Sequence, residues 1–170
     1  MLDPFGNAAD RFRLPATGPT DDMHPGWPES TPFVRLPASA VFPSGARMRL
    51  RPLLRSDGHE WRRQRIEDES FLRSVEPTQA APWAAAHSQQ AWWNHLMYLR
   101  TAAREALVVP LVIEVEGQFV GQITLGNIQH GSIRDCWIGY WVYSAIHGAG
   151  VATAATALGV DHAFGRVGLH

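Results

Sequence analysis

The chain has 170 residues and a formal net charge of −1. This predicts one domain with an appended segment and excludes the basic surface that nucleic acids and anionic membranes require. The single cysteine, Cys136, permits no intrachain disulfide, a usage typical of the cytoplasm, where we expect the protein. All 15 basic residues are arginine, which excludes Schiff-base chemistry on lysine and a Walker A lysine. The longest apolar stretch, residues 106–113, is too short to span a bilayer.

Residues 1–45 are rich in proline and hold eight of the twelve prolines in the chain. Proline removes backbone donors and resists regular structure, so these residues are predicted to form an extended arm that is ordered only where it lies on the domain. We expect residues 1–32 or so to bury little apolar surface and to be dispensable for cofactor binding. Residues 46–170 are predicted to form the domain.

The domain shows both apolar periodicities, a repeat of two residues that indicates strands and one of 3.6 that indicates helices. The first strand pattern alternates Met48 and Leu50 with arginines, and Glu116-Gly117 between two later strand patterns predicts a tight hairpin turn. In chain order we expect a strand at 47–54, a helix ending near residue 68, a helix at 87–104, strands at 106–115, 118–126 and 133–144, and a helix at 150–166. This β-α-α-β-β-β-α order belongs to the α+β class.

The stretch HGAGVATAATALGVDHAF, residues 147–164, consists mostly of small side chains and places glycines directly before the last predicted helix. A helix N-terminus presents unpaired N–H groups and a partial positive charge, and glycines let a bulky anion approach them. HGAGVA therefore predicts either a phosphate cradle made of backbone or a turn that lets the helix pack closely on the sheet. Spacing alone leaves both open. A dinucleotide fingerprint is excluded, because GxGxxG should open an early βαβ unit.

With these elements in place, the chain resembles the GNAT N-acetyltransferases, and within them the RimJ/RimL-type ribosomal-protein alanine N-acetyltransferases. The resemblance covers residues 47–170 and is carried by RMRLRP (47–52), VGQITLGN (120–127), IGYWV (138–142) and GAGVATAA…DHAFGRVGLH (148–170). It implies a GNAT fold, which is a mixed, mostly antiparallel central sheet with flanking helices.

The family continues beyond the position of His170 with a strand, a helix and a further strand. We therefore expect residues 46–170 to be an incomplete GNAT domain, truncated at its C-terminus, with marginal stability and little turnover. The segment IGYWVYS would be left as an apolar sheet edge, which favours self-association. The alternative is that another chain supplies the missing strand.

The resemblance also implies where acetyl-CoA binds. Backbone N–H groups of residues 148–153 would hold the pyrophosphate, and the end of the preceding strand would pair with the pantetheine arm. The implied binding residues are Trp141, Val142, Tyr143, His147, Gly148, Ala149, Gly150, Val151, Ala152 and Thr153. The family usually has arginine or glutamine at the position of His147, which is either a weaker phosphate donor or a solvated loop residue. Gly139 either marks a β-bulge that polarises the thioester or accommodates the neighbouring tryptophans.

Acetyl transfer requires a neutral amine, and the pKa of a protein α-amino group, about 8, lies well below that of lysine, about 10.4. A weak base, or a carboxylate acting through one water, therefore suffices. The candidate carboxylates are Asp135, expected on the third strand of the meander but too far along it to contact the thioester, and Glu76, in the segment that lines the family's acceptor site. A solvated helix end is the alternative for Glu76. No metal site is predicted, because the histidines show no ligand spacing and HExxH is absent.

The activity implied by the resemblance is transfer of an acetyl group from acetyl-CoA to a primary amine. The implied acceptor is the N-terminal alanine of a ribosomal protein. Two alternatives stay open, a small-amine acetyltransferase acting on a polyamine or antibiotic, and a non-catalytic protein that binds coenzyme A or a partner. Acceptor specificity depends on loops that vary within one fold, so the sequence does not separate them.

Overall fold

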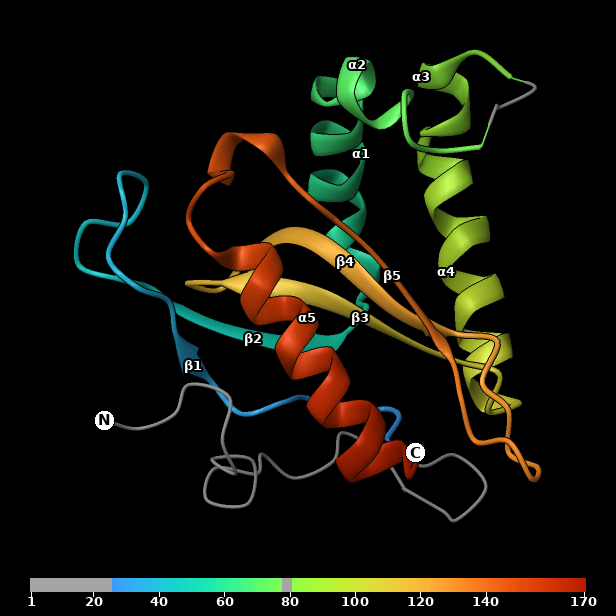
Figure 1. The fold of residues 1–170 in the computed structure, drawn as a ribbon. Coiled ribbons are helices and arrows are strands. Elements are labelled where there is room, and N and C mark those ends of the chain that lie inside the picture. The colour runs from blue at the N-terminus through green and yellow to red at the C-terminus, as the bar shows by residue number, and fades with distance from the viewer. Residues whose placement is uncertain (1–25, 78–80) are drawn as a thin grey trace.

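Antiparallel pairing joins five strands into one sheet, in the order β1-β2-β3-β4-β5 (Figure 1). The computed structural model describes residues 26–77 and 81–170. The expected α+β class with a mostly antiparallel sheet is confirmed. The strands are β1 Val34–Arg35, β2 Arg47–Pro52, β3 Val108–Val115, β4 Gln118–Gly126 and β5 Trp137–Val142.

The helices follow the predicted order, with two additional short ones between the first and second predicted helices. Ser88 caps the longest helix, because its Oγ accepts a hydrogen bond from Ala91 N at 3.1 Å. The helices are α1 Gly58–Glu67, α2 Glu69–Leu72, α3 Trp83–Ala86, α4 Gln89–Arg104 and α5 Val151–His162. Short turns also occur at Arg55–Asp57 (η2), Ser144–Ile146 (η3) and Ala163–Val167 (η4).

The predicted hairpin between β3 and β4 is confirmed. Glu116 and Gly117 have φ angles of 48° and 79°, so both central residues of the two-residue turn are left-handed, as a type I′ turn requires. The two strands then pair along their whole length apart from one irregularity between Ile113 and Glu114.

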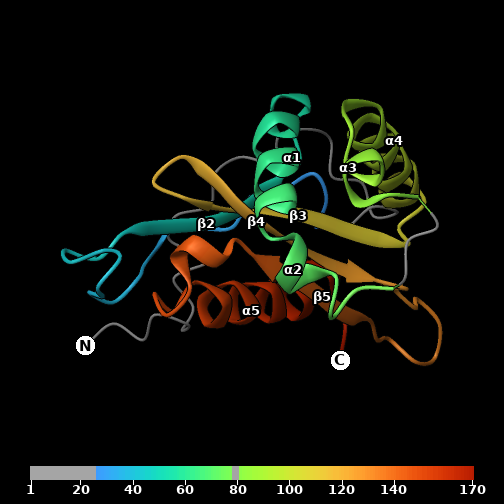
Figure 2. The same cartoon turned by 90° about the horizontal axis from the view of Figure 1, so that it is seen from above.

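Helices cover both faces of the sheet. In the view of Figure 2, α1 and α4 lie on one side of the strands and α5 lies on the other. Because successive residues of a strand point to opposite faces, neighbours in β3 enter different cores. Val112 packs with Trp61, Trp92 and other residues of the α1/α4 side, whereas Ile113 belongs to the larger cluster on the α5 side.

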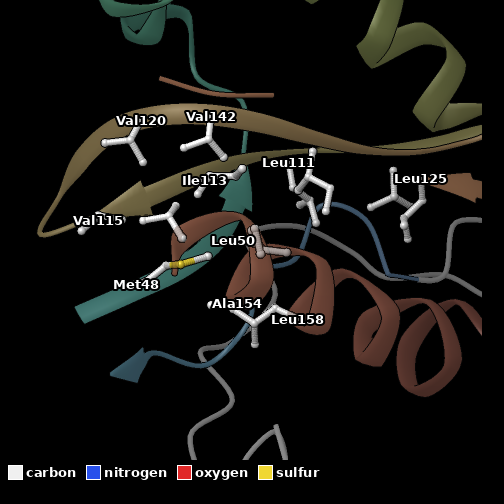
Figure 3. Close-up of a cluster of buried hydrophobic side chains, with 14 of the residues drawn as sticks. Met48, Leu50, Leu111, Ile113, Val115, Val120, Leu125, Val142, Ala154 and Leu158 are labelled. Carbon is white, nitrogen blue, oxygen red and sulfur yellow. The ribbon is translucent and has the colours of Figure 1, made fainter. Parts of the chain in front are cut away.

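The larger core fills the space between the sheet and α5. Figure 3 shows Met48, Leu50 and Ile113 directed toward this space, with Ala154 and Leu158 of α5 beneath them. The small residues of α5 allow this close approach. At Gly159, a Cβ would lie 2.9 Å from Ile123 Cδ1. Gly159 is therefore required for the close packing of this helix on the sheet.

The described part of the proline-rich arm packs on the domain. Gly26, Glu29 and Thr31 are buried, and Leu36 is part of the larger core. Thr31 Oγ1 accepts from Leu50 N at 2.9 Å, and residues 34 and 35 add strand β1 to the sheet. The expectation that residues 1–32 bury little surface is therefore wrong for residues 26–32, while residues 1–25 lie outside the described residues. The boundary at residue 45/46 stays a prediction.

The third strand of the meander is shorter than predicted. β5 begins at Trp137, and residues 133–136 form part of the preceding loop. β5 lies at one end of the sheet order and exposes about half of the Trp137 and Tyr140 side chains, and self-association through this edge stays a prediction. Within residues 26–77 and 81–170, no helix is both long enough and apolar enough to cross a membrane.

Candidate active site

A cavity of about 480 Å³ opens at the N-terminus of α5. It is lined by Val142, Ile146, His147, Gly148 and residues 150–153. Gly148 and Gly150 have φ angles of 79° and 77°, and Gly150 is the N-cap residue of the helix. The turn from η3 into α5 is therefore built on two left-handed glycines that border a cavity.

Unpaired backbone donors face outward from this helix end. The first bond within α5 runs from Ala154 N to Gly150 O at 3.0 Å, so the N–H groups of residues 151–153 have no acceptor within the helix. Gly150 has no side chain to cap them, and they carry the positive end of the helix dipole. This arrangement suits a phosphate or pyrophosphate group.

Backbone conformation rather than crowding requires glycine in this loop. A Cβ on Gly148 would meet nothing within 4 Å, and a Cβ on Gly150 would lie in ordinary contact with Pro37 Cγ at 3.6 Å. A side chain at either position would instead have to adopt a left-handed backbone. Ala149, a predicted binding residue, is buried and does not line the cavity.

The His147 side chain turns toward the end of β5. Its Nε2 lies 3.1 Å from the carbonyl oxygen of Val142, which only accepts, so this nitrogen carries the proton and donates. The ring also meets Phe71 edge-on, with centroids 5.3 Å apart. In its neutral form His147 therefore has no second N–H to offer a phosphate. His147 is exposed in the loop before α5, as the solvated-loop alternative expects, and its contact with a phosphate stays a prediction.

Side chains of α1 hold the segment after β5. Tyr143 donates a hydrogen bond to Glu67 and accepts one from Arg63 Nη1 at 3.2 Å. The bond to Glu67 is the main cause that raises the pKa of Tyr143, and the same bond lowers the pKa of Glu67. Asp68 accepts hydrogen bonds from both the backbone N and the Oγ of Ser144. These bonds fix the loop that leads to the glycines.

The β-bulge considered for Gly139 is absent from the pairing of β5 with β4. The register runs without a shift from Gly121–Val142 to Gly126–Trp137. A Cβ on Gly139 would lie 2.6 Å from Trp137 Cζ3, and one on Gly126 would lie 2.2 Å from Trp137 Cζ2. The Trp137 indole therefore lies across both glycines, and the accommodation of a tryptophan is the reason for Gly139.

A second cavity, of about 640 Å³, lies on the α1/α4 side of the sheet. Its strand wall contains Gln122 and Thr124 of β4 with Gly139, Tyr140 and Trp141 of β5, and its helix wall contains Trp61, Arg65, His87 and His95. Trp141 belongs to this wall, whereas its neighbour Val142 points into the α5-side core and borders the glycine cavity. β5 therefore connects the two cavities.

The two candidate carboxylates lie in different places. Glu76 lines the larger cavity, but both of its oxygens accept hydrogen bonds from Arg65 Nη2, so its negative charge is paired. Asp135 lies in the loop before β5, is exposed, and does not line this cavity. The expectation that Asp135 lies on the strand is therefore wrong, because the strand begins two residues later.

Two histidines of the cavity wall were missed by the sequence reasoning, which looked only for metal spacing. Burial is the main cause that lowers the pKa of both His87 and His95. Because burial lowers their pKa values, both rings are neutral near pH 7, and they line the cavity beside Gly139 to Trp141 of β5. The sequence contained a signal that His95 is buried, because it follows Trp92 by three residues and precedes Leu99 by four on the apolar face of α4.

Arg65 completes this wall. Its guanidinium lies over the rings of Trp61, Trp83 and Trp141, at 5.5, 5.8 and 5.2 Å from the ring centroids. The cavity therefore combines an aromatic lining with one paired charge and two neutral imidazoles. Within the described residues, no group of three His, Cys, Asp or Glu side chains is placed to hold a metal ion.

Comparison with known proteins identifies the family. The family model described as Acetyltransferase (GNAT) domain matches residues 47–170. A solved structure of Mycobacterium smegmatis RimJ in complex with CoA-disulfide is 42% identical, with a TM-score of 0.80 over 87% of this chain and 68% of that one. No curated protein sequence matches significantly.

Two more distant structures share the fold. The ribosomal-protein-S5-alanine acetyltransferase from Vibrio fischeri is 19% identical, with a TM-score of 0.61 over 69% of this chain and 64% of that one. RimL, a ribosomal L7/L12 alpha-N-protein acetyltransferase in complex with coenzyme A, is 17% identical, with a TM-score of 0.55 over 75% and 67%. The chain belongs to the GNAT acetyltransferase family and is of the RimJ/RimL type.

Proposed function

We propose that the protein transfers an acetyl group from acetyl-CoA to the α-amino group of a protein N-terminus, that of a ribosomal protein in particular. The observation that carries this proposal is the cavity at the N-terminus of α5, where two left-handed glycines leave three backbone N–H groups open to an anion. The RimJ and RimL structures named above contain coenzyme A or its disulfide, which supports coenzyme A as the anion.

In this proposal the cavity at α5 binds coenzyme A and the larger cavity binds the acceptor amine. The N–H groups of residues 151–153 would bind the pyrophosphate, and the outer edge of β5 would accompany the pantetheine arm toward Trp141. Acetyl-CoA supplies an activated acyl group as a thioester. The aromatic cavity beside Gly139 to Trp141 would then receive the amine and exclude water from it.

An α-amine suits this cavity better than a lysine side chain. Its pKa of about 8 leaves a usable neutral fraction at pH 7, whereas lysine, at about 10.4, needs a stronger base than the wall offers. Glu76 is the carboxylate among the residues that line this cavity, and it is paired with Arg65. A ribosomal-protein N-terminus that begins with alanine is the proposed acceptor, in line with the RimJ resemblance.

The test offers the purified protein acetyl-CoA with three acceptors and follows products by mass spectrometry. The acceptors are a peptide with a free N-terminal alanine, the same peptide with a blocked N-terminus and an internal lysine, and a polyamine. We expect mass increase only on the free N-terminal alanine. Transfer to the polyamine alone would support the small-amine alternative, and binding of coenzyme A without transfer to any acceptor would support the non-catalytic one.

A further inference from the structure

His95 connects α4 to the strand wall of the larger cavity. Its Nε2 lies 3.3 Å from Gln122 Oε1 of β4, and Gln122 is paired in register with Trp141 of β5. The ring stacks on Trp61, with centroids 5.6 Å apart and planes 24° apart. His95 is therefore held over the part of the sheet where the acetyl group is expected.

Gln122 determines which ring nitrogen carries the proton. Its amide nitrogen donates to Thr124 Oγ1 at 3.3 Å, which turns its oxygen toward His95. An amide oxygen only accepts, so Nε2 of His95 carries the hydrogen and Nδ1 retains its lone pair. Among the described residues, the buried side-chain atoms without a partner are Gln64 Oε1 and Arg65 Nε. Nδ1 of His95 is not one of them, and the ring lines the larger cavity, from which we expect Nδ1 to be reached.

The surroundings of His95 keep the ring neutral. Burial is the largest cause that lowers its pKa, and the charge of Arg65 acts in the same direction. The hydrogen bond that His95 donates to Gln122 and the charge of Glu76 oppose these effects, and His87 is the other titratable group nearby. An uncharged imidazole with an open lone pair is a proton acceptor at neutral pH.

We propose that His95 is the general base of the transfer, taking a proton from the acceptor ammonium through Nδ1, directly or across one water. This inference rests on the proposed function. R–NH₃⁺ and the imidazole give R–NH₂ and imidazolium, which returns its proton to solvent. The neutral amine then forms the C–N bond to the thioester carbonyl, the C–S bond breaks, and the departing thiolate takes the second amine proton. Gln122 is a positioning residue, because it acts only through the ring.

His87 is the competing imidazole, and its position is less suitable. Its Nδ1 lies 2.8 Å from Trp83 O and its ring centroid 4.2 Å from that of Trp83, which places it at the loop that joins α3 to α4. Within the described residues, its ring contacts are with Trp61 and Trp83 and not with β4 or β5. His87→Gln is therefore the matched comparison for His95→Gln.

The test measures pH profiles of kcat/KM with the alanine peptide for the wild type and four variants, His87→Gln among them. We expect His95→Gln to lower kcat about 100-fold and to remove the acidic limb of the profile, with unchanged coenzyme A affinity by calorimetry. Gln122→Glu should shift that limb to higher pH, because a carboxylate beside Nε2–H favours the imidazolium. His59→Gln, at an exposed ring on α1, should change nothing.

A second measurement is independent of turnover. In NMR titrations we expect His95 to titrate below the ordinary histidine pKa, with the proton on Nε2, and its ring signals to move when the peptide is added. The inference would be overturned by an ordinary pKa for His95, by His95 ring signals that do not move when the peptide is added, or by an unchanged pH profile in an active His95→Gln variant. Loss of the acidic limb of the pH profile in His87→Gln but not in His95→Gln would also overturn it. A wild type that transfers to no acceptor overturns the proposed function, and the titration still decides the state of His95.

Discussion

Substitution of Gly150 by asparagine and by aspartate separates backbone geometry from charge at the predicted phosphate site. Gly150 is the N-cap of α5 with a φ of 77°, and a Cβ there would touch Pro37 Cγ at an ordinary 3.6 Å. Asparagine and aspartate are the side chains that tolerate left-handed backbone best. Both variants therefore carry the same strain, about 1 kcal/mol, and have nearly the same size and shape.

The two variants differ by one negative charge beside the bound anion. Two unit charges 4 Å apart interact by about 1 kcal/mol in water and by about 4 kcal/mol at an effective dielectric constant of 20. Because about 1.4 kcal/mol is a factor of ten, Gly150→Asp should bind coenzyme A about 5-fold to about 1,000-fold more weakly than Gly150→Asn. An aspartate oxygen would also compete with the phosphates for the N–H groups of the first helical turn.

Calorimetry with coenzyme A measures this difference in affinity at low salt and at about 0.5 M salt. The difference in affinity between the two variants should decrease at the higher concentration, because salt screens the added charge. Circular dichroism melting serves as the control, and both variants should unfold at similar temperatures. Equal affinities for two folded variants at low salt would show that the phosphates do not lie at the N-terminus of α5.

Three further predictions follow from particular contacts. His147→Arg should tighten coenzyme A binding about threefold at low salt and above pH 7, because a permanent charge is added beside the glycine loop; an unchanged affinity by calorimetry would place residue 147 away from the phosphates. Gly121→Ala should lower the free energy of unfolding by about 3 kcal/mol in urea titrations, because its Cβ would lie 2.2 Å from Trp141 O, whereas Gly131→Ala, in open space, should be nearly neutral. Burial lowers the pKa of three histidines, including His162, so below the unfolded pKa of about 6.5 the unfolded chain binds more protons. Stability should then fall with decreasing pH by up to about 1.4 kcal/mol per pH unit for each ring, and His162→Gln should reduce this slope; an equal slope would contradict the assigned burial effect.

Local signals in the sequence were sufficient for the longer helices and strands and for the glycine loop, but not for the short elements β1, α2 and α3. The hairpin at Glu116-Gly117 and the strand β4 depend on turn chemistry and on period-two alternation, which act between neighbouring residues. Gly148 and Gly150 mark left-handed backbone at a helix start, and this too is a local requirement. These parts of the fold were therefore predictable one segment at a time.

The walls of the larger cavity were decided by tertiary packing. His95 meets Gln122 across 27 positions in the chain, and Arg65 takes both oxygens of Glu76 across 11. Such contacts depend on how far α1 and α4 are rotated about their axes and how closely they lie on the sheet, and a local periodicity contains neither quantity. The same reason applies to Gly139. The sequence does not determine which way the Trp137 side chain points, and only in the packed structure does its indole lie across Gly126 of β4 and Gly139 of β5. The sequence by itself determined the order of the longer elements and the glycine turn before α5, whereas only the packed structure decided which side chains line the larger cavity.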